Sequence, residues 1–311
     1  MSTVRLDPLT GQQIVLSPDR IPPPPAFAPG NLPTVASCPF CPGHEASTGS
    51  TIASVERGGQ WVARAFPNRR PGLRPEAPDH PLVDGVLRGH TGVGAHEVIA
   101  ESASHHEVLE PRIALSLAAE RTEDLRRDRR FGAVTWFRNR GLEAGSSQPH
   151  PHAQVIAVPR APSRLEAVVE HQAVSPRLVQ ELVEVAARNN RVVWQGSGVV
   201  GFCPWAPSTP FEVWFAPTEP IPWLSLDQAR VEALADGLDD VERRLHAAFG
   251  YCSHNVVLFD APNRAVSSGF SWHVRLQPRL VPIGGFERWS GGAIQPIDPV
   301  RAAAVLRGFV T

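Results

Sequence analysis

Two stretches of this 311-residue chain carry the same short pattern. Residues 137–154 contain Asn-Arg, then Ser-Ser, then a histidine that leads into an apolar segment, and residues 261–275 contain these features in the same order. The similar segments 96–102 and 211–217 precede the two copies. A repeat of this kind predicts a duplicated structural unit. We therefore predict an α+β fold in which two copies of one unit share an extended, mainly antiparallel sheet with flanking helices.

Hydrophobic periodicity places regular elements along both halves of the chain. Alternation and β-branched or aromatic residues predict strands at 96–101, 132–139, 152–159, 191–203, 211–217, 253–260 and 271–278. Helical spacing predicts helices at 111–128, 163–188, 225–248 and 298–308. Residues 1–30 are typical of an extended arm that ends in the stiff run Ile-Pro-Pro-Pro-Pro, and residues 74–92 show no clear period. We predict a boundary between residues 160 and 161, with one copy of the unit in each half.

The charge composition limits the classes of partner. Thirty basic and 31 acidic residues leave a net charge of −1, which argues against binding to nucleic acid or to an anionic membrane through bulk charge. Every one of the thirty basic residues is arginine, so lysine Schiff-base chemistry and the P-loop lysine are excluded. No apolar run approaches the ~18 residues of a membrane span, and no apolar stretch follows the arginine near the N-terminus. We therefore expect a cytoplasmic protein.

The cysteines include one closely spaced pair. Cys38 and Cys41 lie in the segment Cys-Pro-Phe-Cys-Pro-Gly-His-Glu, where a redox pair and a metal knuckle are the two interpretations. A redox pair of the thioredoxin type needs a helix directly after it, which Pro42 opposes. The loop therefore favours a metal knuckle, whose turn directs two thiolates at one point. Cys203 and Cys252 are isolated in the sequence, and we expect both to be small buried hydrophobic residues.

A second group of chemically reactive residues is the segment Pro-His-Pro-His-Ala-Gln at 149–154. In extended backbone, His150 and His152 point to the same face of a strand, whereas a kink at Pro151 directs them to different partners. Both histidines can then bind one metal ion, or one can be a ligand and the other a free nucleophile. The further alternative is that both are ordinary core or surface residues.

The residues just before this segment suit a phosphate group. Gly145, Ser146 and Ser147 offer small side chains, backbone N–H groups and two hydroxyls, although an ordinary turn is the alternative interpretation. The second half has Ser271 and Trp272 where the first has a histidine and a proline. The histidine pair thus occurs in one half only, and we expect the chemistry in that half.

Together these motifs resemble the galactose-1-phosphate uridylyltransferase family, the transferase branch of the histidine-triad superfamily. The similarity follows the order of the chain through residues 5–20, 38–45, 66–71, 96–105, 139–154, 210–217, 254–262, 271–279 and 284–292. It implies that the two copies are histidine-triad-like units. It also implies a zinc knuckle and the active site in residues 1–160, and no histidine pair in residues 161–311.

The resemblance implies roles for individual residues. One structural zinc ion per chain would be bound by Cys38, Cys41, His105 and His150. His152 would be the nucleophile. The α-phosphate and the nucleotidyl-histidine would be contacted by Asn139, Gly145, Ser146, Ser147 and Gln154. Asn68 and Arg69 would lie at the nucleoside, and Arg20 would lie near the phosphates.

The family resemblance also implies a homodimer and an activity. Phe286 and Glu287, in the segment 284–292, would help to complete the partner's substrate site. The activity would be nucleotidyl transfer through a covalent nucleotidyl-histidine, with UDP-glucose and a hexose 1-phosphate as the leading substrates. A neutral imidazole divides one exchange between two anions into two easier steps, and the N–H of its other nitrogen should donate a hydrogen bond to a backbone carbonyl.

Two alternative functions remain beside the leading one. The first is a nucleotide-sugar or dinucleotide phosphorylase or adenylyltransferase of the same superfamily, and the second is a zinc-containing nucleotide-binding protein without catalysis. Departures from the family pattern affect the expected identity of the acceptor substrate more than the expected covalent step. Pro23 stands where a second arginine is common, and Arg69 and Arg70 replace a lysine and an aromatic residue. Ser271 replaces the first histidine of a His-Trp-His motif, which predicts no second metal.

Overall fold

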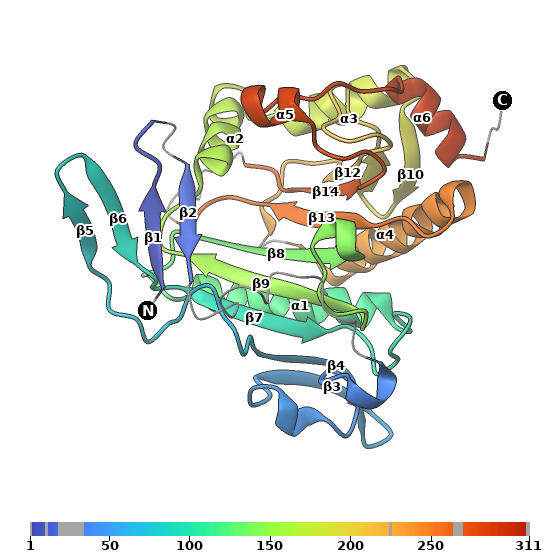
Figure 1. Ribbon diagram of the computed structural model, residues 1–311. Helices are drawn as coiled ribbons and strands as arrows, with labels where there is room; N and C mark the ends of the chain where they lie inside the picture. The colour runs from blue at the N-terminus through green and yellow to red at the C-terminus, as the bar shows by residue number, and fades with distance from the viewer. Residues whose placement is uncertain (1, 10–11, 18–33, 224–225, 264–269, 309–311) are drawn as a thin grey trace. The chain divides into compact units, whose positions relative to one another are not determined.

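The computed structural model describes residues 2–9, 12–17, 34–223, 226–263 and 270–308 (Figure 1). The chain divides into two compact units. Unit 1 comprises residues 1–136, 148–169 and 262–266, and unit 2 comprises residues 137–147, 170–261 and 267–311. The boundary between residues 160 and 161, which rests on the sequence repeat, stays a prediction.

Unit 1 contains two sheets and one long helix. The elements of its larger sheet and the helix are β3 (Ala53–Arg57), β4 (Gln60–Pro67), β7 (Ala95–Ala100), α1 (Pro111–Arg126), β8 (Ala133–Arg140) and β9 (His152–Val158). The strand order is β3-β4-β7-β9-β8, and β8 is divided between the units after Trp136. Helix α1 packs against this sheet (Figure 1). A smaller sheet in the order β2-β1-β6-β5 is formed by β1 (Thr3–Leu6), β2 (Gln13–Leu16), β5 (Pro81–Asp84) and β6 (Leu87–Thr91).

Unit 2 contains the second set of strands and most of the helices. Its strands are β10 (Val192–Gly196), β11 (Val199–Phe202), β12 (Val213–Pro217), β13 (His254–Phe259) and β14 (His273–Pro278). Its helices are α3 (Leu178–Arg188), α4 (Gln228–Phe249), α5 (Gly285–Ser290) and α6 (Pro299–Leu306), and α2 (Ser163–Val174) spans the boundary between the units. The strand order is β10-β11-β12-β14-β13, followed by the second part of β8. Within the described residues, no helix has the length and apolar character needed to cross a bilayer.

The two sets of strands confirm the predicted duplication. In chain order, β3, β4, β7, α1, β8 and β9 correspond to β10, β11, β12, α4, β13 and β14. The strands also neighbour one another in the same order in both sets, and the paired strands are antiparallel. The predicted α+β class is therefore confirmed.

Two elements were predicted too long. The helix predicted over 163–188 is two helices, because Pro176 cannot donate a backbone hydrogen bond and restricts the residue before it. The strand predicted over 191–203 is a hairpin of β10 and β11. Its turn residues Ser197 and Gly198 have φ values of 28° and 76°, a conformation typical of tight hairpins.

Other segments contain structure that the sequence pattern did not reveal. Residues 74–92 include the hairpin of β5 and β6. The predicted extended arm pairs instead as β1 and β2, and its proline run lies outside the described residues. Cys203 and Cys252 are buried, as predicted.

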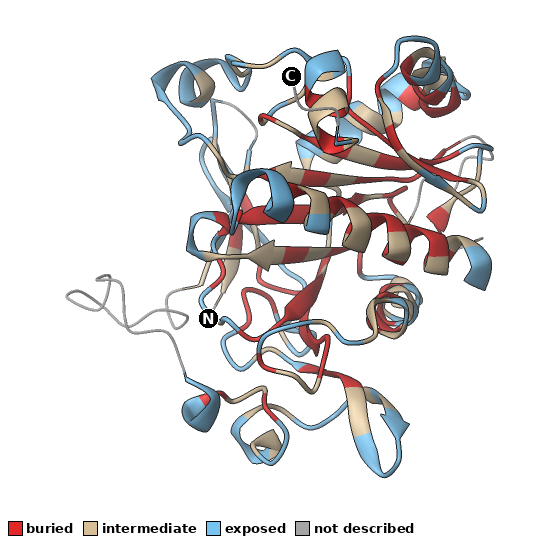
Figure 2. Ribbon diagram, turned by 90° about the vertical axis from the view of Figure 1, so that its right-hand side faces the viewer, coloured by how far each residue is buried: buried red, intermediate tan, exposed pale blue. Residues whose placement is uncertain are grey.

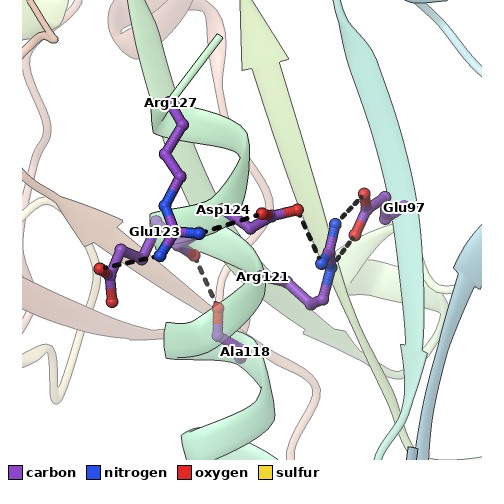
Figure 3. Close-up of polar contacts among 7 residues, drawn as sticks. Glu97, Ala118, Arg121, Glu123, Asp124 and Arg127 are labelled. Carbon is purple, nitrogen blue, oxygen red and sulfur yellow. Dashed lines mark hydrogen bonds and ion pairs between the residues drawn. The ribbon is translucent and has the colours of Figure 1, made fainter. Parts of the chain in front are cut away.

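A buried ion pair joins α1 to the interior strand β7 of unit 1. Strand β7 is buried along its whole length, and Figure 2 shows buried residues concentrated in strands and along one side of the helices. Arg121 on α1 donates to both carboxylate oxygens of Glu97 on β7, at 2.8 and 2.9 Å, and both side chains are buried (Figure 3). Asp124 lies 2.9 Å from the same guanidinium. Because side chains alternate along a strand, the neighbours of Glu97 on β7 point to the opposite face.

Removal of the Glu97 carboxylate should destabilise the fold strongly. Glu97→Ala leaves the Arg121 guanidinium buried without its bidentate partner, so the free energy of unfolding should fall by about 3–5 kcal/mol. The matched control is Glu123→Ala, which removes an exposed ion pair with Arg127 on the same helix and should cost less than about 1 kcal/mol. Urea denaturation followed by circular dichroism measures both values. Equal losses in the two variants would contradict a structural role for the buried pair.

Candidate active site

The four residues predicted to bind zinc lie together in unit 1. The ligand atoms of Cys38, Cys41, His105 and His150 lie within 4.8 Å of one another, and all four residues are buried. The Sγ atom of Cys41 lies 3.3 Å from Nδ1 of His105 and 3.6 Å from Nδ1 of His150. Two thiols and two imidazoles at these separations form a donor set that suits a tetrahedral zinc ion. The chemistry of these residues therefore fits a metal ion.

The loop that carries the cysteines is arranged to present their sulfur atoms. The backbone N–H of Phe40 donates to Sγ of Cys38 at 3.4 Å, which orients this sulfur atom within the loop. Nδ1 of His44 donates to the carbonyl oxygen of Cys38 at 2.6 Å and closes the loop. Burial, together with the neighbouring Cys38, raises the pKa of the Cys41 thiol to about 11. A metal ion must displace this proton, because the thiolate is the form that binds metals.

Each ring nitrogen of His150 has a defined role. Nε2 lies 2.8 Å from the carbonyl oxygen of Ser102. Because a carbonyl can only accept, Nε2 carries a proton and donates a hydrogen bond to it. Nδ1 then directs its lone pair toward Cys41, as metal coordination requires. The hydrogen bond to Ser102 therefore sets both the tautomer and the orientation of the ring.

The predicted nucleophile also has a fixed tautomer. Nδ1 of His152 lies 2.9 Å from the carbonyl oxygen of His150, and a carbonyl can only accept a hydrogen bond. Nδ1 therefore carries the proton, and Nε2 carries the lone pair. The hydrogen bond to a backbone carbonyl that we predicted for this imidazole is thus confirmed, and His150 is the residue that accepts it.

Strand pairing defines the face of the sheet on which His152 lies. Ala100 on β7 pairs with His152, and Val98 pairs with Gln154, so these four side chains share one face. The ring of Phe40 lies 5.4 Å from the ring of His152, at an interplanar angle of 65°. This face is opposite to the one that Glu97 directs toward α1. Helix α1 therefore packs on the face of the sheet opposite to His152.

Two of the predicted substrate residues contact the same histidine. Nε2 of His96 on β7 lies 2.8 Å from Oε1 of Gln154 and 3.3 Å from Nδ2 of Asn68. The structure thus brings Gln154 and Asn68 together in unit 1. Arg69 instead donates from Nη1 to the carbonyl oxygen of Ser47 at 2.8 Å, and it is exposed.

The predicted phosphate loop lies in unit 2, directly after β8. The 3-10 helix η4 (Leu142–Ala144) ends at Gly145, whose φ of 83° favours glycine. The backbone N–H of Ser146 donates to the carbonyl oxygen of Gly141 at 3.0 Å and closes the loop. Ser146 is buried, whereas Ser147 is exposed.

The amide group of Asn139 on β8 has a fixed orientation. Nε of Arg279 donates to Oδ1 of Asn255 at 2.5 Å, and a guanidinium has donors only. Asn255 therefore directs Nδ2 toward Oδ1 of Asn139, at 2.7 Å, and toward the carbonyl oxygen of Ala144, at 2.8 Å. With its oxygen occupied, Asn139 has its NH2 group as the end that can reach a ligand.

Three predicted site residues remain. Arg20 lies outside the described residues. Phe286 and Glu287 are in the short helix α5 of unit 2. Phe286 is half exposed, and the Glu287 carboxylate accepts two backbone hydrogen bonds from its own segment. Glu287 therefore stabilises the end of its own helix.

In unit 2, the position that corresponds to His150 is occupied by Ser271, which forms hydrogen bonds with two glutamine side chains. Ser271, at the position of the first histidine of the pair, exchanges two backbone hydrogen bonds with the Gln172 side chain, at 2.7 and 3.0 Å. Nε2 of Gln180 donates to Oγ of Ser271 at 3.0 Å and to the carbonyl oxygen of Pro217 at 3.3 Å. Gln180 thus connects the segment before β14 to the end of β12, and Gln172 holds the backbone of Ser271.

Three residues that orient predicted site residues were not predicted from the sequence. They are His96, Asn255 and Arg279. Each belongs to a segment that carries the family resemblance, so a polar residue in an apolar strand was a visible signal. The partner of each one, however, depends on strand pairing and not on spacing in the sequence.

The chain is similar to several known proteins. A family model described as "Galactose-1-phosphate uridyl transferase, N-terminal domain" matches residues 1–162. An ADP-glucose phosphorylase of Arabidopsis thaliana is 26% identical over 325 residues, which cover 98% of this chain and 92% of that protein. A galactose-1-phosphate uridylyltransferase of Thermotoga maritima is 25% identical over 332 residues, which cover 99% and 98%.

A solved structure shows the same fold. The crystal structure of an Arabidopsis thaliana ADP-glucose phosphorylase with bound ADP-glucose matches with a TM-score of 0.76 at 24% sequence identity. The match covers 100% of this chain and 99% of that chain. The two chains therefore share their fold over their whole lengths.

Metal content should depend on Cys41. Cys41→Ser removes one thiolate, so zinc bound per chain should fall from about one to nearly none, and the midpoint of thermal unfolding should fall with it. As the pH falls, protons compete for the Cys41 thiol, and this thiol alone should lower the apparent zinc affinity roughly tenfold per pH unit. Elemental analysis and titration against a chromophoric chelator measure these effects. Cys203→Ser, at a buried cysteine of unit 2, is the matched control, and full zinc retention in Cys41→Ser would contradict the four-residue site.

Proposed function

Because the chain belongs to the galactose-1-phosphate uridylyltransferase family, we propose that it transfers a nucleotidyl group through a covalent bond to Nε2 of His152. The observation that carries this proposal is the hydrogen bond from Nδ1 of His152 to the carbonyl oxygen of His150. It leaves the lone pair on Nε2, and a neutral imidazole with this lone pair can attack phosphorus.

The reaction has two balanced steps. In the first, the lone pair on Nε2 of His152 forms a bond to the α-phosphorus of a nucleotide sugar, the bond to the bridging oxygen breaks, and the sugar 1-phosphate leaves with the electron pair. In the second, an oxygen of the acceptor phosphate attacks the same phosphorus, and Nε2 recovers its electron pair. The proton on Nδ1 stays in place, and the His150 carbonyl stabilises the positive charge that develops on the ring.

Other residues are proposed to bind the substrates. We propose that the transferred phosphate accepts hydrogen bonds from Asn139, Gly145, Ser146, Ser147 and Gln154. Asn68 and Arg69 are assigned to the nucleoside and Arg20 to the phosphates.

We also propose a cytoplasmic homodimer, in which the segment with Phe286 and Glu287 completes the site of the second chain. A zinc ion, when bound by Cys38, Cys41, His105 and His150, would supply a fixed cross-link that holds the His150 backbone.

UDP-glucose and a hexose 1-phosphate are the proposed substrates. The support is the family and the Thermotoga maritima relative named as a galactose-1-phosphate uridylyltransferase. ADP-glucose with inorganic phosphate is the second candidate pair, because the Arabidopsis thaliana relative that covers 98% of this chain is named as an ADP-glucose phosphorylase.

Covalent labelling tests the proposal directly. UDP-glucose and ADP-glucose are offered separately, each radiolabelled at the α-phosphate, and the protein is denatured in base before the label is counted. We expect close to one label per chain from one of the two, because the nucleotidyl-histidine accumulates when no acceptor is present. The nucleotide that labels the protein distinguishes uridylyl from adenylyl transfer. No label from either nucleotide, at full metal content, would contradict covalent transfer and favour a nucleotide-binding protein without catalysis.

The two paired histidines should respond differently to substitution. His152→Ala should lower nucleotidyl exchange by more than about a thousandfold while the metal stays, because the nucleophile is lost. His150→Ala should lose the metal first and activity as a consequence, because Nδ1 of His150 lies 3.6 Å from Sγ of Cys41. Metal analysis and exchange assays on the same preparations separate these outcomes. Near-normal exchange in His152→Ala would show that transfer is direct or uses another residue.

A further inference from the structure

His96 lies on the face of the sheet that carries His152. Along β7, His96 points to the same face as Val98 and Ala100, which pair with Gln154 and His152 on β9. His96 is 5% exposed, so its ring nitrogens need partners within the protein. It lies outside the predicted metal cluster, and the proposed transfer step does not use it.

Two contacts fix the proton of His96. The backbone N–H of Gly72 donates to Nδ1 at 3.1 Å, so Nδ1 carries a lone pair. The single proton of the neutral ring therefore lies on Nε2, which is 2.8 Å from Oε1 of Gln154. Nδ2 of Asn68 lies 3.3 Å from the same Nε2, but both are donors, so they form no hydrogen bond and the shorter contact with the Gln154 oxygen is the one that Nε2–H makes. Oδ1 of Asn68 already accepts from the backbone N–H of Arg70 at 2.9 Å.

We infer that His96 is a positioning residue that fixes the amide of Gln154 so that its NH2 group, and not its oxygen, is presented to the transferred phosphate. The inference rests on the proposed function. A glutamine amide has two orientations of nearly equal shape, and rotation by 180° would place its NH2 group against the Nε2–H of His96, donor against donor. Among the described residues, His96 is the hydrogen-bond partner of the Gln154 side chain, so it sets this choice.

The choice matters because phosphate oxygens are acceptors only. An amide oxygen directed at the phosphate would repel it, whereas an NH2 group donates to the negative charge that builds up during transfer. Gln154 follows His152 by two positions on the same strand, so both side chains leave the same face of the sheet. His96 therefore acts on the reaction through Gln154 and without touching the substrate.

Two substitutions of His96 separate hydrogen bonding from packing. His96→Gln can place an NH2 group near the position of Nε2 and keep the bond to Gln154, whereas His96→Phe keeps a ring and removes both nitrogens. In single-turnover formation of the nucleotidyl-histidine, His96→Phe should be slower by roughly ten- to a hundredfold, and His96→Gln should recover most of the rate. The Kd for the nucleotide sugar should change less than about threefold in both variants. His90→Phe, on strand β6, is the matched control and should keep the wild-type rate.

A double-mutant cycle tests whether His96 acts through Gln154. Added to Gln154→Ala, His96→Phe should slow the reaction by less than about threefold, because the amide that it orients is already absent. The full single-variant loss in that background, or failure of His96→Gln to recover the rate, would overturn the inference.

Nitrogen NMR of the His96 ring needs no turnover, so it separates this inference from the proposed function. We expect a protonated Nε2 and an unprotonated Nδ1, and a proton on Nδ1 would overturn the inference. A wild-type protein that shows the expected tautomer but takes no covalent label would contradict the proposed activity and keep the assigned amide orientation.

Discussion

His150 connects the candidate metal cluster of unit 1 to His152, the proposed nucleophile. Its Nδ1 lies among the cysteines, its Nε2–H donates to Ser102, and its carbonyl accepts the Nδ1–H of His152. Pro151, between the two histidines, has no N–H, and its carbonyl accepts from the backbone N–H of Glu101 at 3.0 Å, which continues the pairing of β7 with β9. Any shift of His150 therefore reaches the ring of His152 through one hydrogen bond. A metal ion at this position would act on the reaction by holding the backbone, at a distance from phosphorus.

Single hydrogen bonds also fix the orientation of two amide groups, those of Gln154 and Asn139. Nε2–H of His96 occupies the oxygen of Gln154 in unit 1, and Asn255 occupies the oxygen of Asn139 in unit 2. Each orientation traces back to a group that can only donate, the backbone N–H of Gly72 in the first case and the guanidinium of Arg279 in the second. Both amides are thereby left to donate, as an anionic ligand requires. The proposed function thus agrees with the direction of these hydrogen bonds as well as with the identity of the residues.

Short spacing in the sequence predicted which side chains lie together, because closely spaced residues share a local geometry. The cysteine loop and the pair of histidines two positions apart are of this kind. His105 could be assigned only through the resemblance, since it joins the cluster through the fold. The contact of His96 with Gln154 depends on the register between β7 and β9, which no local pattern contains. The helix predicted over 163–188 was too long for a different reason: its apolar spacing continues across Pro176, and the proline ends the hydrogen-bond ladder.

In the second copy of the repeat, the histidine that corresponds to the proposed nucleophile has different partners. His273 opens β14 as His152 opens β9, but Nε of Arg275 donates to its Nε2 at 3.1 Å. The ring of His273 is also stacked on Phe259, with centroids 4.9 Å apart and 6° between the planes. Nε2, the atom proposed to attack phosphorus in the first copy, is therefore the acceptor of a guanidinium hydrogen bond in the second. The residue two positions after the histidine makes this difference, since Gln154 directs its oxygen to His96 whereas the guanidinium in unit 2 donates to the imidazole itself. The two copies thus share their strand framework and differ in the side chain two positions after the histidine, which supports the proposal that the chemistry belongs to the first copy.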